Sequence, residues 1–146
     1  MFKFIYMLLH EYSDNKTDKG EKLLHSIELG YFSTKKKAKK VIDKYKTKEG
    51  FNEHPIKCFK IKRFLLKTQE YNVKNIYELY HSYIDKDGFE EYNYLGVFSD
   101  EESALKKQNK LISRHKKYRE NAQGFDISEE LIDSENVIWA EGFKKL

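Results

Sequence analysis

The 146-residue chain has few of the residues that mark secreted or membrane proteins. It contains one cysteine, so an internal disulfide framework is excluded and nothing points to an oxidising compartment. No apolar run approaches the roughly 18 residues of a membrane-spanning helix. The apolar start at residues 1–9 meets His10 and Glu11 without a small-residue cleavage site. We therefore expect a cytoplasmic protein that does not enter a membrane.

Aromatic residues are abundant by contrast. Charged residues make up 36% of the chain and hydrophobic residues 39%, a balance that alone would favour disorder. Ten Phe, eleven Tyr and one Trp, together 15% of the residues, favour a folded chain instead, because disordered chains are poor in aromatic side chains. We expect a small core that is rich in aromatic rings.

The sequence contains an internal duplication. Residues 5–12 return as residues 76–83, an offset of 71, and residues 29–33 (Leu-Gly-Tyr-Phe-Ser) return as residues 95–99 (Leu-Gly-Val-Phe-Ser), an offset of 66. The difference falls in the loop after the first repeated segment, where changes of length are tolerated. The matches recur in the same order, which indicates two copies of one module.

Each copy has the pattern of strand, strand, helix and strand. Residues 6–12 alternate as in a half-buried strand. Ser33 and Ser99 are at positions typical of helix N-caps, and Ser99 forms a capping box with Glu102. The predicted fold class is α+β: a tandem duplication of a ββαβ module, pseudo-twofold related, with one helix packed on each antiparallel sheet.

Charge divides the chain into a basic module, residues 1–70, and an acidic module, residues 71–146, which we expect to share an interface. Residues 1–73 carry 17 basic and 9 acidic side chains, a net charge of 17 − 9 = +8, whereas residues 74–146 carry 11 and 15, a net charge of −4. Three basic residues, Lys60, Lys62 and Arg63, correspond in the second copy to Asp126, Ser128 and Glu129, two of which are acidic. The opposite charges predict that the third strands of the two copies pair with each other.

The repeated motifs resemble an uncharacterised family of small bacterial proteins, a domain of unknown function. The family pattern has a Tyr-x-Leu-x-His strand, an Ile-Gly-x-Tyr-Ser element, a Gly-Phe-x-x-x-Pro-x-x-Phe-x-Ile segment and a Trp-x-Glu-Gly-Phe ending. Matching residues are Tyr6, Leu8 and His10, then Tyr77, Leu79 and His81, Leu29 to Ser33, Gly50, Phe51, Pro55, Phe59 and Ile61, and Trp139 to Phe143. The first copy lacks the tryptophan ending and the second lacks the Gly-Phe segment. The resemblance implies two tandem copies and no assigned chemistry.

The first functional hypothesis is a non-enzymatic protein-binding module of a bacterium or its phage. An immunity protein or an inhibitor of a defence protein would act by stoichiometric occlusion of its partner. Acidic residues of the second module would face a basic, nuclease-like target: Asp100, Glu101, Glu102, Glu129, Glu130, Asp133 and Glu135. Against this hypothesis, such immunity proteins are usually acidic overall, and this chain has a net charge of +4.

The alternative is a nucleic-acid-binding accessory protein. Lysines clustered on the first predicted helix would neutralise phosphates and gain affinity from counterion release: Lys35, Lys36, Lys37, Lys39, Lys40 and Lys44. Helix-turn-helix, zinc-finger and RNP-type signatures are absent. A solvated helix face explains the same lysines without any partner.

His10 and His81 occupy the same position in the two copies. They are interpreted either as a metal or catalytic pair or as half-buried histidines that hydrogen-bond near a strand end. Cys58 with His54 would make a nucleophile and base, but Gly124 replaces Cys58 in the second copy, and a free cysteine is more often a small core residue. With no zinc-ligand cluster or nucleophilic triad in the sequence, we expect no metal, no cofactor and no enzymatic activity.

Overall fold

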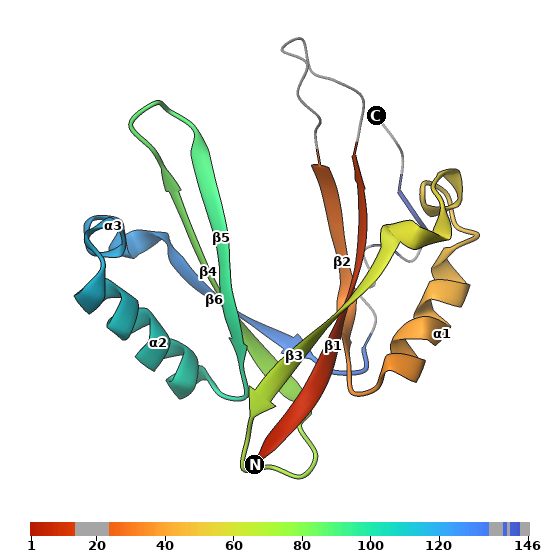
Figure 1. Cartoon of the computed structure of the whole chain (residues 1–146), viewed down its shortest axis with the longest axis horizontal. Helices are drawn as coiled ribbons and strands as arrows, with labels where there is room; N and C mark the ends of the chain where they lie inside the picture. Colours follow the sequence, from red (N-terminus) through yellow and green to blue (C-terminus); the bar gives the residue numbers. More distant parts are fainter. Residues whose placement is uncertain (14–23, 135–138, 140, 144–146) are drawn as a thin grey trace. The chain divides into compact units, whose positions relative to one another are not determined.

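The computed structural model describes residues 1–13, 24–134, 139 and 141–143 (Figure 1). The order strand, strand, helix, strand occurs twice, which confirms the predicted α+β class and the duplication of the module. The first copy contains β1 (Phe2–Ser13), β2 (Leu24–Phe32), α1 (Lys35–Tyr45) and β3 (Phe59–Lys67). The second contains β4 (Asn75–Ile84), β5 (Glu90–Phe98), α2 (Glu101–Arg114), α3 (Lys116–Glu120) and β6 (Phe125–Leu131).

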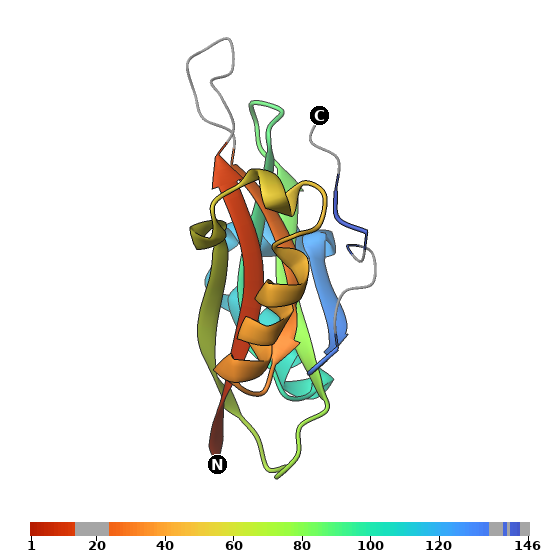
Figure 2. The same cartoon turned by 90° about the vertical axis from the view of Figure 1, so that its right-hand side faces the viewer.

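The first sheet has the strand order β2-β1-β3, and α1 covers one of its faces (Figure 2). Ala38, Val41 and Tyr45 form the apolar stripe of α1, with the i, i+3, i+7 spacing of one helix face, and all three are buried. They pack with Leu8 of β1 and with Phe51 of the loop before β3. The predicted aromatic core lies here, between α1 and the sheet.

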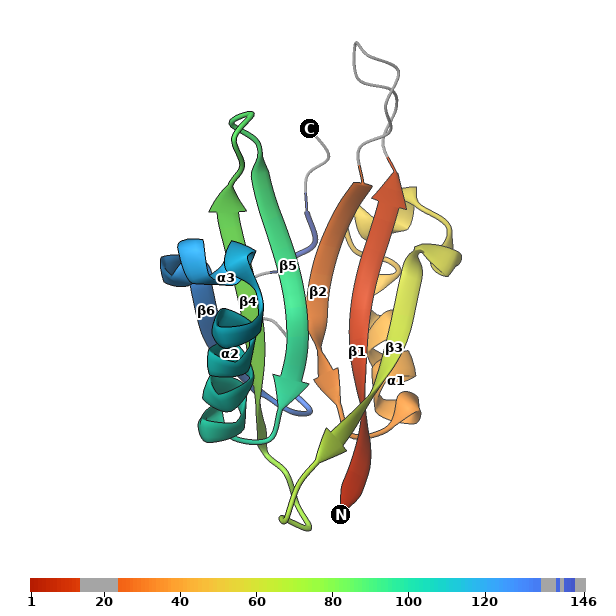
Figure 3. The same cartoon turned by 60° about the vertical axis from the view of Figure 1, so that its left-hand side comes forward.

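The second sheet has the strand order β5-β4-β6, with α2 on one face (Figure 3). Its helix-side core is smaller than that of the first sheet. Leu79 of β4 and Ala104 of α2 are fully buried, whereas Leu105 of α2 is 41% exposed. Among the described residues, no helix combines the length and apolar character that crossing a membrane requires.

Both copies contain a β-bulge at the same position. Leu8 pairs with Gly30 and Leu9 with Glu28, which leaves Leu29 as the extra residue of β2. In the second copy β5 has the equivalent extra residue, one position before Gly96. Gly30 and Gly96 have φ angles of 140° and 147°, which L side chains rarely adopt. The shared irregularity supports the duplication at the level of the backbone.

The two main helices begin one residue later than the sequence predicts. The N-caps are Thr34, whose hydroxyl accepts from the Lys37 N–H, and Asp100, whose carboxylate accepts from the Ser103 N–H. Each predicted serine cap is therefore wrong by one position. A serine followed by a second cap-forming residue presents two adjacent start sites, and local sequence does not choose between them.

The chain divides into two units that differ at both ends from the contiguous modules 1–70 and 71–146. The first unit contains Phe4–Leu65 and Ile132–Leu146, and the second contains Met1–Lys3 and Leu66–Leu131. Backbone hydrogen bonds account for the difference. The Asp133 N–H donates to the Tyr31 carbonyl at 2.8 Å within the first unit, and the Thr68 N–H donates to the Met1 carbonyl at 3.0 Å within the second.

Within each unit the third strand pairs with the first strand of the same copy. β3 is a neighbour of β1 in one sheet, and β6 pairs with β4 in the other. Lys60 and Lys62 of β3 lie 3.2 and 3.8 Å from the carboxylate of Glu11 in the first unit. The pairing of the third strands with each other stays a prediction.

Candidate functional site

The lysine face of α1 consists of six exposed side chains: Lys35, Lys36, Lys37, Lys39, Lys40 and Lys44. The alternation of these lysines with the buried stripe of Ala38, Val41 and Tyr45 forces them onto the solvent side of the helix. In the structure these lysines therefore lie around the solvent side of α1, opposite the buried stripe.

The charges of α1 oppose its own stability. The first turn of α1 contains Lys35, Lys36 and Lys37 and no acidic residue, although the N-terminal end of a helix carries a partial positive charge. The pairs 35/39, 36/40 and 40/44 place like charges at i, i+4, which also destabilises a helix. Each such feature costs about 0.2–1 kcal/mol. No acidic side chain in the first turn of α1 offsets Lys35 and Lys36.

Lys37 has a partner in the segment after β6. Its Nζ lies 2.9 Å from a carboxylate oxygen of Asp133. The same carboxylate accepts from the backbone N–H and the hydroxyl of Ser33, both at 2.8 Å. Burial raises the pKa of Asp133, but the Ser33 N–H and Lys37 outweigh it and hold the pKa below its usual value. Asp133 is thus already engaged within the first unit.

Helix α2 shows the opposite pattern of charge. Asp100 caps its N-terminus, and Glu101 and Glu102 occupy its first turn, where the helix dipole favours them. The Ser103 N–H, which donates to the cap at 2.7 Å, holds the pKa of Asp100 below its usual value. Glu102 also lies 3.7 Å from Lys106 at the favourable i, i+4 spacing. Helix stability alone accounts for these acidic residues.

Three of the predicted acidic residues gather around Tyr77 on β4. Tyr77 pairs with Glu129 of β6, and on its other side with Phe98, which leads into Asp100 and Glu101. Burial and the charges of Glu129 and Glu101 raise the pKa of the Tyr77 hydroxyl. The amide of Asn75 also donates to Glu129. This acidic surface around Tyr77 belongs entirely to the second unit.

The remaining predicted acidic residues lie elsewhere. Glu130 follows Glu129 in β6 and therefore points to the opposite face of the sheet. Asp133 belongs to the first unit, and Glu135 lies outside the described residues. The seven acidic residues predicted to form one binding surface are thus divided between two units and two faces of a sheet.

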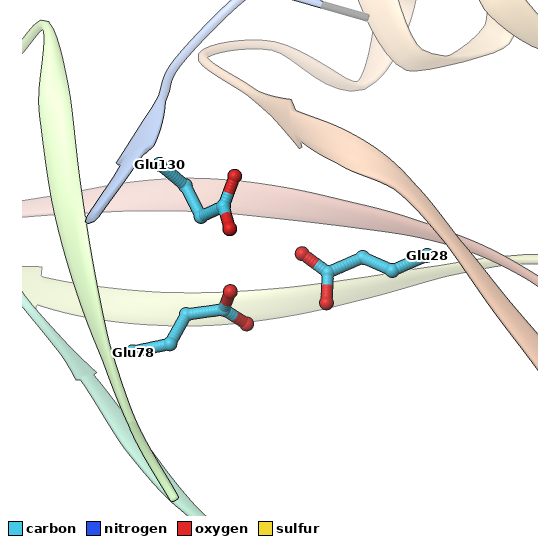
Figure 4. Close-up of side chains that lie close together, drawn as sticks. All are labelled: Glu28, Glu78 and Glu130. Atoms are coloured by element: carbon cyan, nitrogen blue, oxygen red, sulfur yellow. The ribbon is translucent and has the colours of Figure 1, made fainter. Parts of the chain in front are cut away.

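Glu130 has an acidic neighbour on its own face of the second sheet. A carboxylate oxygen of Glu78 on β4 lies within 4.8 Å of one from Glu130, and both side chains point the same way (Figure 4). Glu28, also drawn there, is on β2 of the first unit. The hydroxyl of Ser128 donates to Glu130 at 3.0 Å. Two carboxylates supply far fewer ligands than the six to eight oxygens around Ca²⁺, so we assign no metal to this pair.

The two equivalent histidines are both buried but have different surroundings. His81 Nε2 donates to the carbonyl of Asn121 at 2.8 Å, as the structural interpretation of this residue predicts. Neither ring nitrogen of His10 has a hydrogen-bond partner among the described residues. Burial, and then the charge of His54, lowers the pKa of His10 to about 4. The histidines belong to different units, and we assign neither of them a catalytic role.

The difference between the histidines follows from the residue before the third strand. A Cβ atom on Gly124 would lie 1.9 Å from the carbonyl oxygen of Ser82, so only glycine allows the turn to approach β4 and His81 this closely. Cys58 takes this position in the first unit and carries the atom that such an approach excludes. The His10 ring is therefore contacted by the rings of Phe51 and Phe59 instead, whose centroids lie 4.9 and 4.8 Å from its own.

A cavity of about 480 Å³ lies beside β1 in the first unit. Cys58 and His54, the possible nucleophile and base, both line it, together with Glu11, Tyr12 and Lys60. Strand alternation places Tyr12 on the same face as His10, but neither Tyr12 nor Glu11 was predicted from the sequence as a site residue. The ring of Tyr12 stacks on that of His54 at 4.0 Å, and Glu11 is ion-paired to Lys60. With these groups engaged with one another, we assign the cavity no chemistry.

A comparison with family models finds one match. The model described as Domain of unknown function (DUF7336) matches residues 3–75, which is half of the chain and contains most of β1 and all of β2, α1 and β3. Searches of curated proteins and of solved structures found no match.

Proposed function

The chain belongs to the family described as a domain of unknown function (DUF7336), and from its own residues we propose that it is a binding module that holds nucleic acid through the lysine face of α1. The observation that carries the proposal is the placement of Lys35, Lys36 and Lys37 in the first turn of α1. Positive charge there lowers the stability of the helix, and among the described residues Lys37 is the one of these three lysines with an ion-pair partner. A polyanion bound along this face would remove that penalty.

Phosphate binding by this face would be independent of sequence. Lysine ammonium groups on flexible stems neutralise phosphates but do not read base edges, and no base-reading motif accompanies them. Most of the affinity would come from counterions released from the nucleic acid, so it would fall steeply with salt. We therefore expect similar affinities for unrelated duplexes of equal length.

Fluorescence anisotropy with a labelled 20-base-pair duplex tests the proposal. If four lysines each neutralise one phosphate, the slope of log affinity against log salt is about −3.6, and affinity falls about 150-fold between 50 and 200 mM salt. A variant with Lys35, Lys36, Lys39 and Lys40 changed to Gln should lose most of this salt dependence. An unchanged slope in this variant would refute the proposal.

The matched control changes four lysines of the second helical region to Gln. Lys106, Lys107, Lys110 and Lys116 lie on α2 and α3, so the control removes the same charge from a helix whose N-terminal turn is acidic. Its affinity should remain within about twofold to threefold of wild type. An equal loss in both variants would indicate a response to net charge alone.

A second candidate function is the stoichiometric occlusion of a basic protein, as in a bacterial immunity protein or a phage inhibitor acting in the cytoplasm. The acidic surface around Tyr77 favours it, because Asp100, Glu101 and Glu129 converge there within one unit. Inhibition assays on a panel of purified basic nucleases test this candidate. Stoichiometric inhibition that is lost when Glu101 and Glu129 are changed to Gln supports it, and no inhibition of any panel member counts against it.

A further inference from the structure

Each copy passes into the unit of the other copy at the end of its third strand, within the last residues of β3 and directly after β6. The chain passes from the first unit to the second between Leu65 and Leu66, and returns between Leu131 and Ile132. These crossings are 131 − 65 = 66 residues apart, which is also the offset between the two copies in this region. Both copies therefore transfer the chain at the same position of the module.

Equivalent serines hold the two transferred segments. The hydroxyl of Ser99 donates to the carbonyl of Lys67 at 2.8 Å. The hydroxyl of Ser33 donates at 2.8 Å to the carboxylate of Asp133, the residue equivalent to Lys67. These are the serines whose position suggested helix caps. Their contacts instead tie the start of each helix to the segment that arrives from the other copy.

The closing segment, which we define as residues 132–134, 139 and 141–143, also fills the far end of the first unit. Phe143 packs edge-on against Phe51 with ring centroids 4.8 Å apart, and its N–H donates to the Glu49 carbonyl at 2.8 Å. A Cβ on Gly50 would lie 2.3 Å from the Phe143 carbonyl oxygen, so the segment needs glycine there. Trp139 packs on the same core. The aromatic core of the first unit is incomplete without this segment.

The closing surface, formed by Tyr31, Ser33, Lys37 and Glu49–Phe51, occurs once in the chain, as does the closing segment. The first copy has the Gly-Phe-x-x-x-Pro segment that begins at Gly50 and has no tryptophan ending, and the second copy has the ending but no such segment, with lysines at the equivalent positions 116 and 117. The segment leaves the second unit directly after Leu131, and Asp133 near this junction has a left-handed φ of 64°. A segment joined in this way can make the same contacts on another molecule.

We propose that the closing segment is exchangeable, and that the closing surface accepts it from a second copy of this chain as well as from its own. The contacts made in the two cases are identical, so the choice depends on the connection and on protein concentration. The expected product is a domain-swapped dimer that forms when the chain is refolded at high concentration. This inference does not depend on nucleic-acid binding.

Complementation between two full-length variants tests the exchange. Phe143→Ala damages the segment, and Gly50→Ala damages the surface. When the two are unfolded and refolded together, a mixed dimer contains one intact segment facing one intact surface. Native mass spectrometry with one chain labelled with ¹⁵N should detect this mixed dimer, with a melting temperature above that of either variant alone. No mixed dimer, or an unfolding curve equal to the sum of the two variants, would overturn the proposal.

A milder pair covers the case in which those variants do not fold. Ser33→Ala and Asp133→Asn change exposed residues at the other end of the closing segment. The control pair, Ser113→Ala with Asp43→Asn, makes the same chemical changes away from the closing surface. Mixed dimers should be several-fold more abundant in the first mixture than in the control. Equal abundance in the two mixtures would overturn the proposal.

Discussion

Acid should destabilise the first unit through His10. This side chain is 0% exposed, and burial lowers its pKa to about 4. Its folded pKa is therefore below the ordinary value of about 6.5, so the unfolded chain binds the proton first as the pH falls. The stability that neutral His10 provides is present in full above pH 6.5 and is lost between pH 6.5 and 4.

The magnitude follows from linkage between protonation and folding. With pKa values of about 6.5 unfolded and about 4 folded, the free energy of unfolding falls by about 2 kcal/mol between pH 7 and pH 5. The full loss at lower pH is about 3 kcal/mol. For a chain of this size, 2 kcal/mol corresponds to a fall in melting temperature of about 4–8 °C.

Urea titrations at pH 7, 6 and 5, followed by circular dichroism and by the emission of Trp139, measure this loss. His10→Phe keeps a ring among Phe51 and Phe59 but cannot bind a proton, so its stability should change far less over the same range. His115→Phe removes an exposed histidine and should behave as wild type. If His10→Phe loses as much stability as wild type, burial of a neutral His10 is not the source of the acid sensitivity.

Three further substitutions test the electrostatics and packing described above. Lys35→Glu should raise stability by about 0.5–1 kcal/mol by thermal denaturation, because it replaces an unfavourable charge in the first turn of α1, and Glu101→Lys in α2 should lower it by a similar amount. Asp100→Ala should cost about 1 kcal/mol in urea, whereas Asp100→Asn, which keeps a capping oxygen, should cost less than half of that. Gly124→Ala should lower the free energy of unfolding, measured in urea, by about 1–3 kcal/mol through overpacking against β4. Cys58→Ala at the equivalent site, where the native residue already has a Cβ, should be nearly neutral.

The local sequence pattern was sufficient to predict the strands and helices and their order along the chain. Period-2 alternation and the apolar stripe of α1 depend on neighbours only a few residues apart, so they are visible in a single sequence. The helix starts were wrong by one residue because Ser33 and Thr34 can both cap. The end of α2 has no such local signal: His115 has extended angles, φ −127° and ψ 122°, which break the helix before α3 without any glycine or proline.

The candidate sites were predicted less evenly, for a related reason. The lysine face lies on one helix, so helical spacing alone places its members together. The acidic set is spread over α2, β6 and the segment after β6, and its arrangement depends on topology. Strand alternation could have separated Glu129 from Glu130. Only the fold shows that Asp133 belongs to the first unit, where Ser33 and Lys37 bind it.

The packing of the closing segment on the first unit has a counterpart in the sequence, because each copy lacks one of the two motifs that meet there. The first unit uses both the Gly50-Phe51 pair and the tryptophan ending, because Phe143 packs on Phe51 and Gly50 admits its backbone. The pair comes from the first copy and the ending from the second, and the two meet in this unit. Opposite losses in the two copies are therefore what a chain would show when the ending of the second copy closes the core of the first, as the contacts of Phe143 require.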